Sequence, residues 1–452
     1  MGFNMPSSFI SLIILMAFIL VSFIVIKRPI YEIMVLGYIV TIICTGRYDV
    51  FWKNLIKPST SSLFFAVVAF LLLAHILDET GVIQQVIDIV LSLAGRFPGG
   101  AGYVAVAVST FMSALSGSGP GNVAATGVFT IPAMKETGFP AELAANIETS
   151  ASCLGPMIPP SGTILLAYGI LNEFLPASQK IPMSRFWMIV WGVGLCYILQ
   201  RVITTWLYCK YYKVQPMSEE DVKPLSETLR TGWAAALLPI IILAPFVIDA
   251  TMKTTLTNLV TSAGAKAFSN TLLIFIPGVA AVYCMLISKT SFKKTFDILK
   301  DSVPKIVPIA ATVYFSYSIA YVFGDIGMDK ALAEVVTSFQ LPKLALTIVA
   351  VLFFAVIGMI LPGSGSLAIF GGSFLAIFAE VGVNPVLIAA VLPALTGALS
   401  GMVPPVAVAL YTAVGIAEAD IGKAIKMSIV WAGAHLLLTL MLMLELLPVL
   451  GL

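Results

Sequence analysis

The chain carries one pair of helix-breaking motifs twice, and this internal repeat limits its possible folds more than any other feature. The first copy has Ser-Gly-Ser-Gly-Pro at 116–120 and Met-Ile-Pro-Pro at 157–160. The second has Gly-Ser-Gly at 363–365 and Met-Val-Pro-Pro at 402–405, an offset of 245 to 246 residues. Matching Gly and Pro interruptions in two hydrophobic halves are typical of secondary transporters, and they point to the binding site.

Composition places this repeat in a membrane. The chain has 452 residues, of which 59% are hydrophobic and 11% charged, whereas soluble domains carry about a quarter charged residues. Continuous apolar runs such as 9–26 are typical of helices and not of the alternating strands of a β-barrel. We therefore expect an all-α polytopic membrane protein. The first run, followed by Lys27 and Arg28, is expected to stay as a helix and not to be removed as a signal peptide.

Some apolar stretches are long enough to cross a bilayer and others are interrupted. The predicted full spans are 9–26, 30–45, 61–80, 186–209, 231–250, 271–288, 303–323 and 427–449.

Residues 101–115 and 119–133 would each rise only about 22 Å as helices, less than the ~30 Å hydrocarbon core. They flank the motif at 116–120 and predict a re-entrant helical hairpin. Residues 345–361 and 367–380 predict a second hairpin.

Each predicted hairpin precedes a helix that is broken at Pro-Pro. The broken helices are 141–155 with 161–170, and 386–401 with 406–416. With the N-terminus outside, most Lys and Arg fall on the cytoplasmic side, as the positive-inside rule requires. The hairpins then enter from opposite faces, the first from inside, which makes the halves inverted repeats. The expected units are 1–95 (scaffold), 96–183 (first repeat core), 184–344 (central scaffold, with a polar linker at 214–231), 345–422 (second repeat core) and 423–452 (C-terminal helix).

The broken elements predict the site chemistry. Non-helical backbone survives at membrane depth only where it lines a protein-walled cavity. Freed carbonyls and hydroxyls suit Na⁺, and half-helix N-termini suit a carboxylate. The predicted Na⁺ ligands are Ser116, Gly117, Ser118, Asn122, Gly155, Pro159, Gly363, Ser364, Gly365, Thr396, Gly401 and Pro404. The predicted substrate contacts are Ser118, Ser161, Thr163, Ser364 and Ser366. No transition-metal site is expected, because His75 and His435 lack ligand spacing.

Two predictions leave alternatives open. Ser161 and Thr163 either line the substrate cavity or bond back to helix carbonyls. Glu148 lies on an apolar helix, where a carboxylate is a functional hypothesis by default. It either couples transport directly or pairs with a neighbouring helix. The five cysteines are interpreted as small hydrophobic fillers.

Several segments are similar to a known family. They are Arg-Phe-Pro-Gly-Gly at 96–100, Ser-Gly-Ser at 116–118, Asn-Val-Ala-Ala-Thr-Gly at 122–127, Ile-Pro-Ala-Met-Lys at 131–135, Pro-Pro at 159–160, and Pro-Pro at 404–405 with Ala-Val-Gly-Ile-Ala at 413–417. Together they resemble the large membrane (permease) subunit of TRAP (tripartite ATP-independent periplasmic) transporters, over essentially the whole chain.

The resemblance implies an elevator-type, Na⁺-driven importer of an organic acid in the inner membrane of a bacterium or archaeon. It also implies two partners, a periplasmic substrate-binding protein and a small four-helix membrane subunit, which is here expected to be either a separate chain or absent. The expected cofactor is Na⁺, and no enzymatic activity is expected. A stand-alone Na⁺/carboxylate symporter of the same superfamily remains an alternative. A distant alternative is an intramembrane serine hydrolase using Ser118 or Ser364, although both lack the GxSxG motif.

Overall fold

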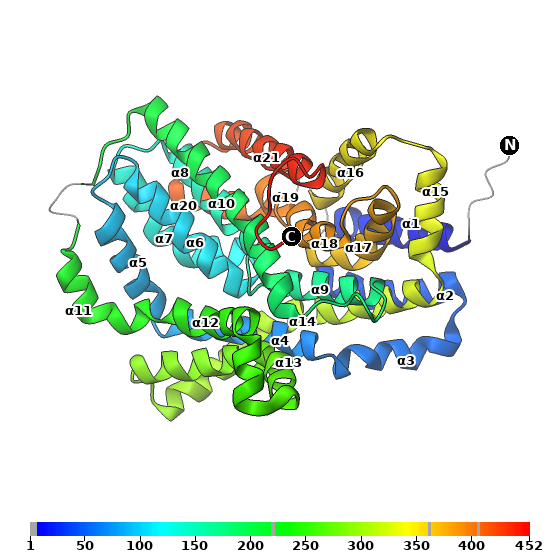
Figure 1. The fold of residues 1–452 in the computed structure, drawn as a ribbon. Coiled ribbons are helices and arrows are strands. Elements are labelled where there is room, and N and C mark those ends of the chain that lie inside the picture. The colour runs from blue at the N-terminus through cyan, green and yellow to red at the C-terminus, as the bar shows by residue number, and fades with distance from the viewer. Residues whose placement is uncertain (1–6, 218–221, 360–362, 405–406) are drawn as a thin grey trace.

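The computed structural model describes residues 7–217, 222–359, 363–404 and 407–452, and every regular element in these ranges is helical (Figure 1). Within these ranges, seven helices are long and apolar enough to cross a membrane, or eight if one bent pair counts as a single span. The predicted all-α, polytopic fold is confirmed.

The first hairpin consists of α6 (Gly100–Ser116) and α7 (Gly119–Glu136), which pack against each other. Gly117 ends α6 with φ +62°, a left-handed conformation that glycine adopts without strain. The Ser118 hydroxyl then caps α7 by accepting a hydrogen bond from the Gly121 N–H at 3.2 Å. The hairpin predicted from two short helices is therefore formed by local capping at its tip.

The first broken helix consists of α8 (Ala141–Ser152), a 3₁₀ turn η4 (Gly155–Met157) and α9 (Gly162–Phe174). The non-helical segment that contains Pro159 is buried. Ser161 begins α9, because its hydroxyl accepts a hydrogen bond from the Thr163 N–H at 3.2 Å. The break predicted at Pro-Pro is confirmed.

The second half repeats this order with differences. Its hairpin has α16 (Lys343–Gly358) and α17 (Gly363–Glu380), and its broken helix has α18 (Pro385–Gly397), α19 (Leu399–Met402) and α20 (Val408–Ala417). The motif residues Pro362 and Pro405 lie outside the described residues. Since α17 begins at Gly363, Gly365 and Ser366 belong to its first turn and not to the loop that was predicted there. The predicted continuous segment 386–401 is wrong, because α18 already ends at Gly397.

The two repeats pack into each other. Helix α17 lies against α9, and α20 lies against α7 and α8. The Lys135 ammonium, near the end of α7, donates a 2.8 Å hydrogen bond to the carbonyl of Ala417, the last residue of α20. A positive charge at a helix C-terminus complements the helix dipole. Because helices of each repeat pack against helices of the other, the two breaks lie close together in the middle of the molecule.

Long helices flank this centre. They include α1 (Ser7–Leu20, continued by a π-helical turn Val21–Val25), α2 (Ile30–Thr45), α4 (Ser62–Glu79), α10 (Met183–Tyr212), α14 (Phe292–Asp325) and α21 (Ile421–Met443). In Figure 1, α21 lies at the top, and α12 (Leu238–Thr251) and α13 (Lys253–Ile287) lie at the bottom.

Shorter helices complete the fold: α3 (Phe51–Ile56), α5 (Val82–Ala94), α11 (Leu225–Ala236) and α15 (Met328–Ser338). The predicted span 231–250 is a pair, α11 and α12, bent by 43°. The polar linker at 214–231 is partly helical, since α11 begins within it and packs on α5. The Lys223 ammonium lies 2.9 Å from the Asp88 carboxylate of α5, and this hydrogen bond raises the pKa of Lys223.

Candidate functional site

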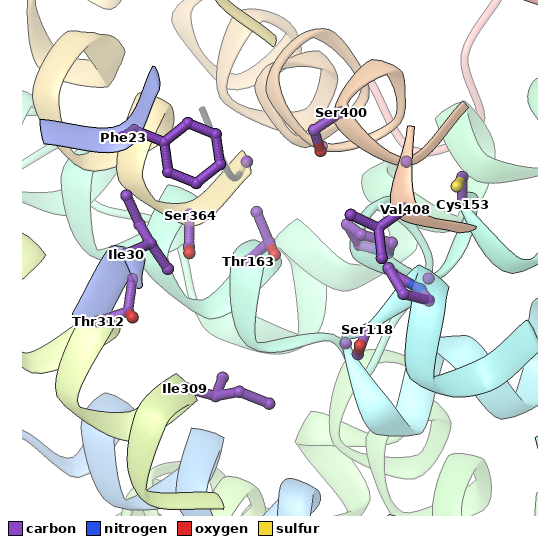
Figure 2. A pocket seen from close by; sticks show the side chains of 17 residues that line it. Phe23, Ile30, Ser118, Cys153, Thr163, Ile309, Thr312, Ser364, Ser400 and Val408 are labelled. Atoms are coloured by element: carbon purple, nitrogen blue, oxygen red, sulfur yellow. The ribbon is translucent and has the colours of Figure 1, made fainter. Parts of the chain in front are cut away.

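A cavity of about 250 Å³ lies between the two hairpin tips and the two broken helices, and we call it the central cavity (Figure 2). It is lined by Phe23, Ile30, Gly117, Ser118, Gly119, Pro120, Cys153, Pro156, Thr163, Ile309, Thr312, Gly363, Ser364, Gly397, Ser400, Gly401 and Val408. Figure 2 shows hydroxyl-bearing side chains from several different helices, such as Ser118, Thr163 and Ser364, around one space.

Four half-helices begin at this cavity. The lining includes the first residues of α7, α17 and α20 (Gly119, Gly363 and Val408) and the second residue of α9, Thr163. The first N–H groups of a helix have no intrahelical partner, and the helix dipole places partial positive charge there. Such ends bind anions. Since no side chain is charged among the lining residues that the structure describes, an anion would depend on these N–H groups and on any cation bound with it.

Half-helix C-terminal ends line the same cavity. Gly117 and Cys153 follow directly after α6 and α8, Gly397 ends α18, and Gly401 lies within the four-residue α19. Carbonyls at such ends lack intrahelical donors and carry partial negative charge, so they suit a cation. The cavity is therefore lined by the N-terminal ends of some half-helices and the C-terminal ends of others. None of its described lining residues has a charged side chain.

Glycine at the contacts lets the tips approach the breaks closely. A Cβ on Gly363 would lie 2.9 Å from the Thr396 carbonyl oxygen and 3.0 Å from the Gly397 nitrogen. A Cβ on Gly155 would collide with the backbone and hydroxyl of Ser113 in α6. Each hairpin thus packs directly on the broken helix of its own repeat.

The predicted site residues fall into two groups. The central cavity is lined by Gly117, Ser118, Thr163, Gly363, Ser364 and Gly401. It is not lined by Ser116, Asn122, Gly155, Pro159, Ser161, Gly365, Ser366, Thr396 or Pro404.

Two of the residues that do not line the cavity use their hydroxyl groups in hydrogen bonds to the backbone. The Thr396 hydroxyl donates back to the Leu392 carbonyl at 2.9 Å, and Ser161 caps α9. Ser366 is fully buried and its hydroxyl has no hydrogen-bond partner within the described part of the chain.

Sequence reasoning missed some of the cavity. Cys153 and Ser400 lie next to the breaks, where their position beside small and cyclic residues could have indicated them. Ile309 and Thr312 on α14, with Phe23 and Ile30 from the N-terminal helices, form a separate wall. Proline lies directly before Ile30 and Ile309, but neither proline belongs to the repeated motifs, so the repeat did not mark this wall.

A second cavity of about 630 Å³ adjoins the first, and we call it the vestibule. Both cavities are lined by Ser118 and Ile309, and the predicted ligands Ser116 and Asn122 face the vestibule. Its far wall carries Lys305, whose ammonium lies 3.7 Å from the Glu79 carboxylate and 3.4 Å from the His75 Nδ1.

The other histidine, His435, is fully buried, as expected of a structural residue. Its Nδ1 lies 3.2 Å from the guanidinium of the equally buried Arg201, and its Nε2 lies 2.9 Å from the Ala394 carbonyl of α18. The Arg201 Nε also donates to the Ser150 carbonyl of α8 at 3.4 Å. This pair therefore joins α10 and α21 to both broken helices.

Comparison with known proteins agrees with this architecture. A family model described as "Tripartite ATP-independent periplasmic transporter, DctM component" matches residues 9–450. The chain belongs to this family. It is accordingly a multi-pass inner-membrane protein, a TRAP transporter large permease subunit, and the resemblance seen in the sequence is confirmed.

Curated relatives include permeases named for different substrates. The 2,3-diketo-L-gulonate large permease YiaN of Escherichia coli is 22% identical over 379 residues, covering 83% of this chain and 82% of that protein. The C4-dicarboxylate permease DctM of Pseudomonas aeruginosa is 24% identical and covers 84% and 83%. The sialic acid permease SiaM of Vibrio cholerae is 22% identical and covers 76% and 75%.

Two solved structures share the fold. Neisseria gonorrhoeae MtrF has a TM-score of 0.64 at 13% identity, covering 86% of this chain and 82% of that one. The Alcanivorax borkumensis YdaH transporter has a TM-score of 0.59 at 14% identity, covering 88% and 87%. At such identities the likeness concerns the fold alone.

Proposed function

We propose that this permease imports an organic acid together with Na⁺ by an elevator movement. The observation that carries the proposal is the convergence of four half-helix N-termini on the central cavity. Each N-terminus contributes ~0.3–2 kcal/mol toward a bound anion. The names of the relatives, which include C4-dicarboxylate and sialic acid permeases, support the same class of substrate.

Na⁺ is the proposed coupling ion because it offsets the substrate charge where the described side chains supply none. The first cation site would use the tip at Ser116 to Ser118 with the adjoining break, and the second would use Gly363 to Ser366 with Thr396. The buried, unpartnered hydroxyl of Ser366 supports the second site. An unpaired buried hydroxyl costs free energy that a bound ion would recover.

The proposed movement follows from the two walls of the cavity. The hairpins and broken helices form one wall, and the uninterrupted helices that carry Ile30 and Thr312 form the other. A rigid shift of the first wall against the second would carry the cavity between the two sides of the membrane.

The proposed partners are a periplasmic substrate-binding protein and a small four-helix membrane subunit that braces the fixed helices. The stand-alone symporter is the second candidate. It predicts uptake without either partner, whereas the TRAP assignment predicts that uptake requires the binding protein. A hydrolase has no support, since His435 is bonded to Arg201 and Ala394 and His75 is bonded to Lys305.

Uptake into proteoliposomes tests coupling. Permease reconstituted with its binding protein and small subunit should accumulate a labelled organic acid only under an inward Na⁺ gradient, without ATP. Equal uptake in K⁺ alone removes Na⁺ from the mechanism.

Cross-linking tests the movement in a background without the five native cysteines. A cysteine pair at Ser118 and Ile309, which line the same cavities from opposite walls, should trap transport in one state. A control pair at Thr110 and Ala151 lies within the moving unit, where the threonine hydroxyl is 3.4 Å from the alanine carbonyl. This pair should leave transport intact. If neither pair affects uptake, the site is stationary and the elevator movement is wrong.

A further inference from the structure

Glu148 lies in the middle of α8 and is fully buried between α8 and the first hairpin. Four hydroxyl groups surround its carboxylate. Thr126 and Ser152 lie 2.7 and 2.9 Å from Oε1, and Ser109 and Thr130 lie 2.8 and 2.6 Å from Oε2. Each carboxylate oxygen thus accepts two hydrogen bonds, and the donors come from α6, α7 and α8.

The proton count shows which form of the group this cage fits. A hydroxyl has one proton, and for each of the four the carboxylate is the nearest acceptor. Thr130, for example, lies 2.6 Å from Glu148 but 3.2 Å from the Thr126 carbonyl. When all four hydroxyls donate to it, two acceptor positions on each carboxylate oxygen are filled, so the cage can hold the group in its ionised form. The charge has no ion-pair partner within the described part of the chain.

The cage is joined to the first hairpin tip through Asn122. The Asn122 amide donates to the Ser152 hydroxyl at 2.8 Å and to the Ser109 carbonyl at 3.0 Å, and it lies 3.2 Å from the Thr126 hydroxyl. Ser152 in turn donates to Glu148, and it is the last residue of α8 before the break. Asn122 itself lines the vestibule beside Ser116 and Ser118. The carboxylate therefore fixes the rotamer of a side chain next to the tip.

The second repeat has no such group. At the repeat offset, the counterpart of Glu148 falls at Leu392 to Ala394, a purely apolar run of α18. Among the described residues, the first repeat core therefore carries a buried carboxylate behind its tip, and the second carries none at the matching position.

We propose that Glu148 is a positioning residue that orients Asn122 and backs the first cation site with a fixed negative charge, so that the two cation sites differ in affinity. This inference rests on the proposed Na⁺ coupling. A fixed charge in a water-poor interior acts on a cation over several ångströms. The first site then holds Na⁺ more tightly than the second and fills before the substrate binds.

Na⁺ binding to purified permease in nanodiscs tests the inference without transport. Thermal stability and ²²Na⁺ binding are titrated with Na⁺ in place of choline. Glu148→Gln keeps the volume and removes the charge, and it should raise the half-saturating Na⁺ concentration of the tighter site by about ten-fold. The matched control is Glu142→Gln on the same helix, where the carboxylate lies 3.9 Å from the exposed Lys423 ammonium. This control should leave the Na⁺ titration unchanged.

A double variant separates positioning from mere stability. If Glu148 acts through Asn122, then Glu148→Gln should add little to the effect of Asn122→Ala, because coupled residues are non-additive. If Glu148→Gln lowers stability without Na⁺ but leaves the Na⁺ midpoint unchanged, the group is only structural and the inference is wrong.

If Glu148→Gln does not fold, the double variant Ser152→Ala/Thr126→Val decides, since it removes both hydroxyls that link Asn122 to the carboxylate and keeps the charge. An unchanged midpoint in that variant overturns the inference, and a rise of about three-fold supports it. If the wild-type protein shows no response to Na⁺, the proposed coupling and this inference fail together. If the wild-type protein responds to Na⁺ and Glu148→Gln responds with the same midpoint, the inference is wrong while the proposed coupling stands.

Discussion

Replacing Gly363 by alanine should displace the second hairpin tip, whereas the same change at Gly365, two residues along α17, should be tolerated. The new Cβ at 363 would lie 2.9 Å from the Thr396 carbonyl oxygen and 3.0 Å from the Gly397 nitrogen. These are backbone atoms, which cannot rotate away. A Cβ at 365 would meet no atom within 4 Å outside its own helix.

The magnitudes follow from the geometry. Overpacking a fixed site costs ~1–3 kcal/mol, and alanine in place of glycine stabilises a helix by up to ~1 kcal/mol. Both positions lie in α17, so the helix gain applies to both variants and cancels in the comparison. Gly363→Ala should therefore be less stable than Gly365→Ala by about 1–3 kcal/mol. Since the tip would separate from α18, Gly363→Ala should also weaken Na⁺ binding at the second site, whereas Gly365→Ala keeps the backbone carbonyl that this site would use.

The assay compares the two variants in the same nanodiscs by thermal unfolding and Na⁺ titration. The reasoning is refuted if both alanine variants shift equally, or if Gly365→Ala is the more damaged. Either result would mean that the tip does not depend on close contact with the second broken helix.

Two further predictions concern charged groups away from the tips. Arg201→Ala should destabilise the protein in reversible detergent unfolding by ~1–3 kcal/mol for each buried acceptor that it leaves unpaired, namely the His435 Nδ1 and the Ser150 carbonyl, and Arg201→Met should cost less because it keeps the volume. The Lys343 ammonium, 2.6 Å from the Glu445 carboxylate, holds the pKa of Glu445 below its usual value. A lowered folded-state pKa stabilises above the unfolded value of about 4.3, and this contribution disappears as the pH falls through the folded value. The melting-temperature gap between wild type and Glu445→Gln at pH 7 should therefore close as the pH falls toward 3.

The sequence predicted the parts of the fold that depend on local breaks. Glycine and proline at 117 and 159 interrupt apolar runs, and a broken backbone at membrane depth requires a cavity. The sequence did not predict α5, since polar residues such as Gln84 and Asp88 on one face hide a short amphipathic helix from a search for apolar runs. It also did not predict that α18 ends at Gly397, which depends on contact with the second tip.

The candidate site was predictable where backbone chemistry defines it and not where packing does. Gly117 and Ser364 are recognisable because they belong to the repeated motif. Thr312 is not, because only the tertiary fold brings its helix α14 against the tips. The network around Glu148 is of the same kind: the sequence marks a carboxylate on an apolar helix, but its hydroxyl partners on α6 and α7 become known only when the hairpin is folded.

The buried Arg201 also bears on which helices would move. Sequence reasoning assigned 184–344, which includes α10, to the fixed scaffold. Yet the Arg201 guanidinium of α10 bonds the Ser150 carbonyl of α8 and lies beside His435 of α21, which in turn bonds α18. A shift that left α10 behind would break these hydrogen bonds at every cycle. Each buried group that lost its partner would cost ~1–3 kcal/mol. Under the proposed movement, α10 and α21 therefore travel with the broken helices, and the fixed wall is formed by helices such as α1, α2, α4 and α14.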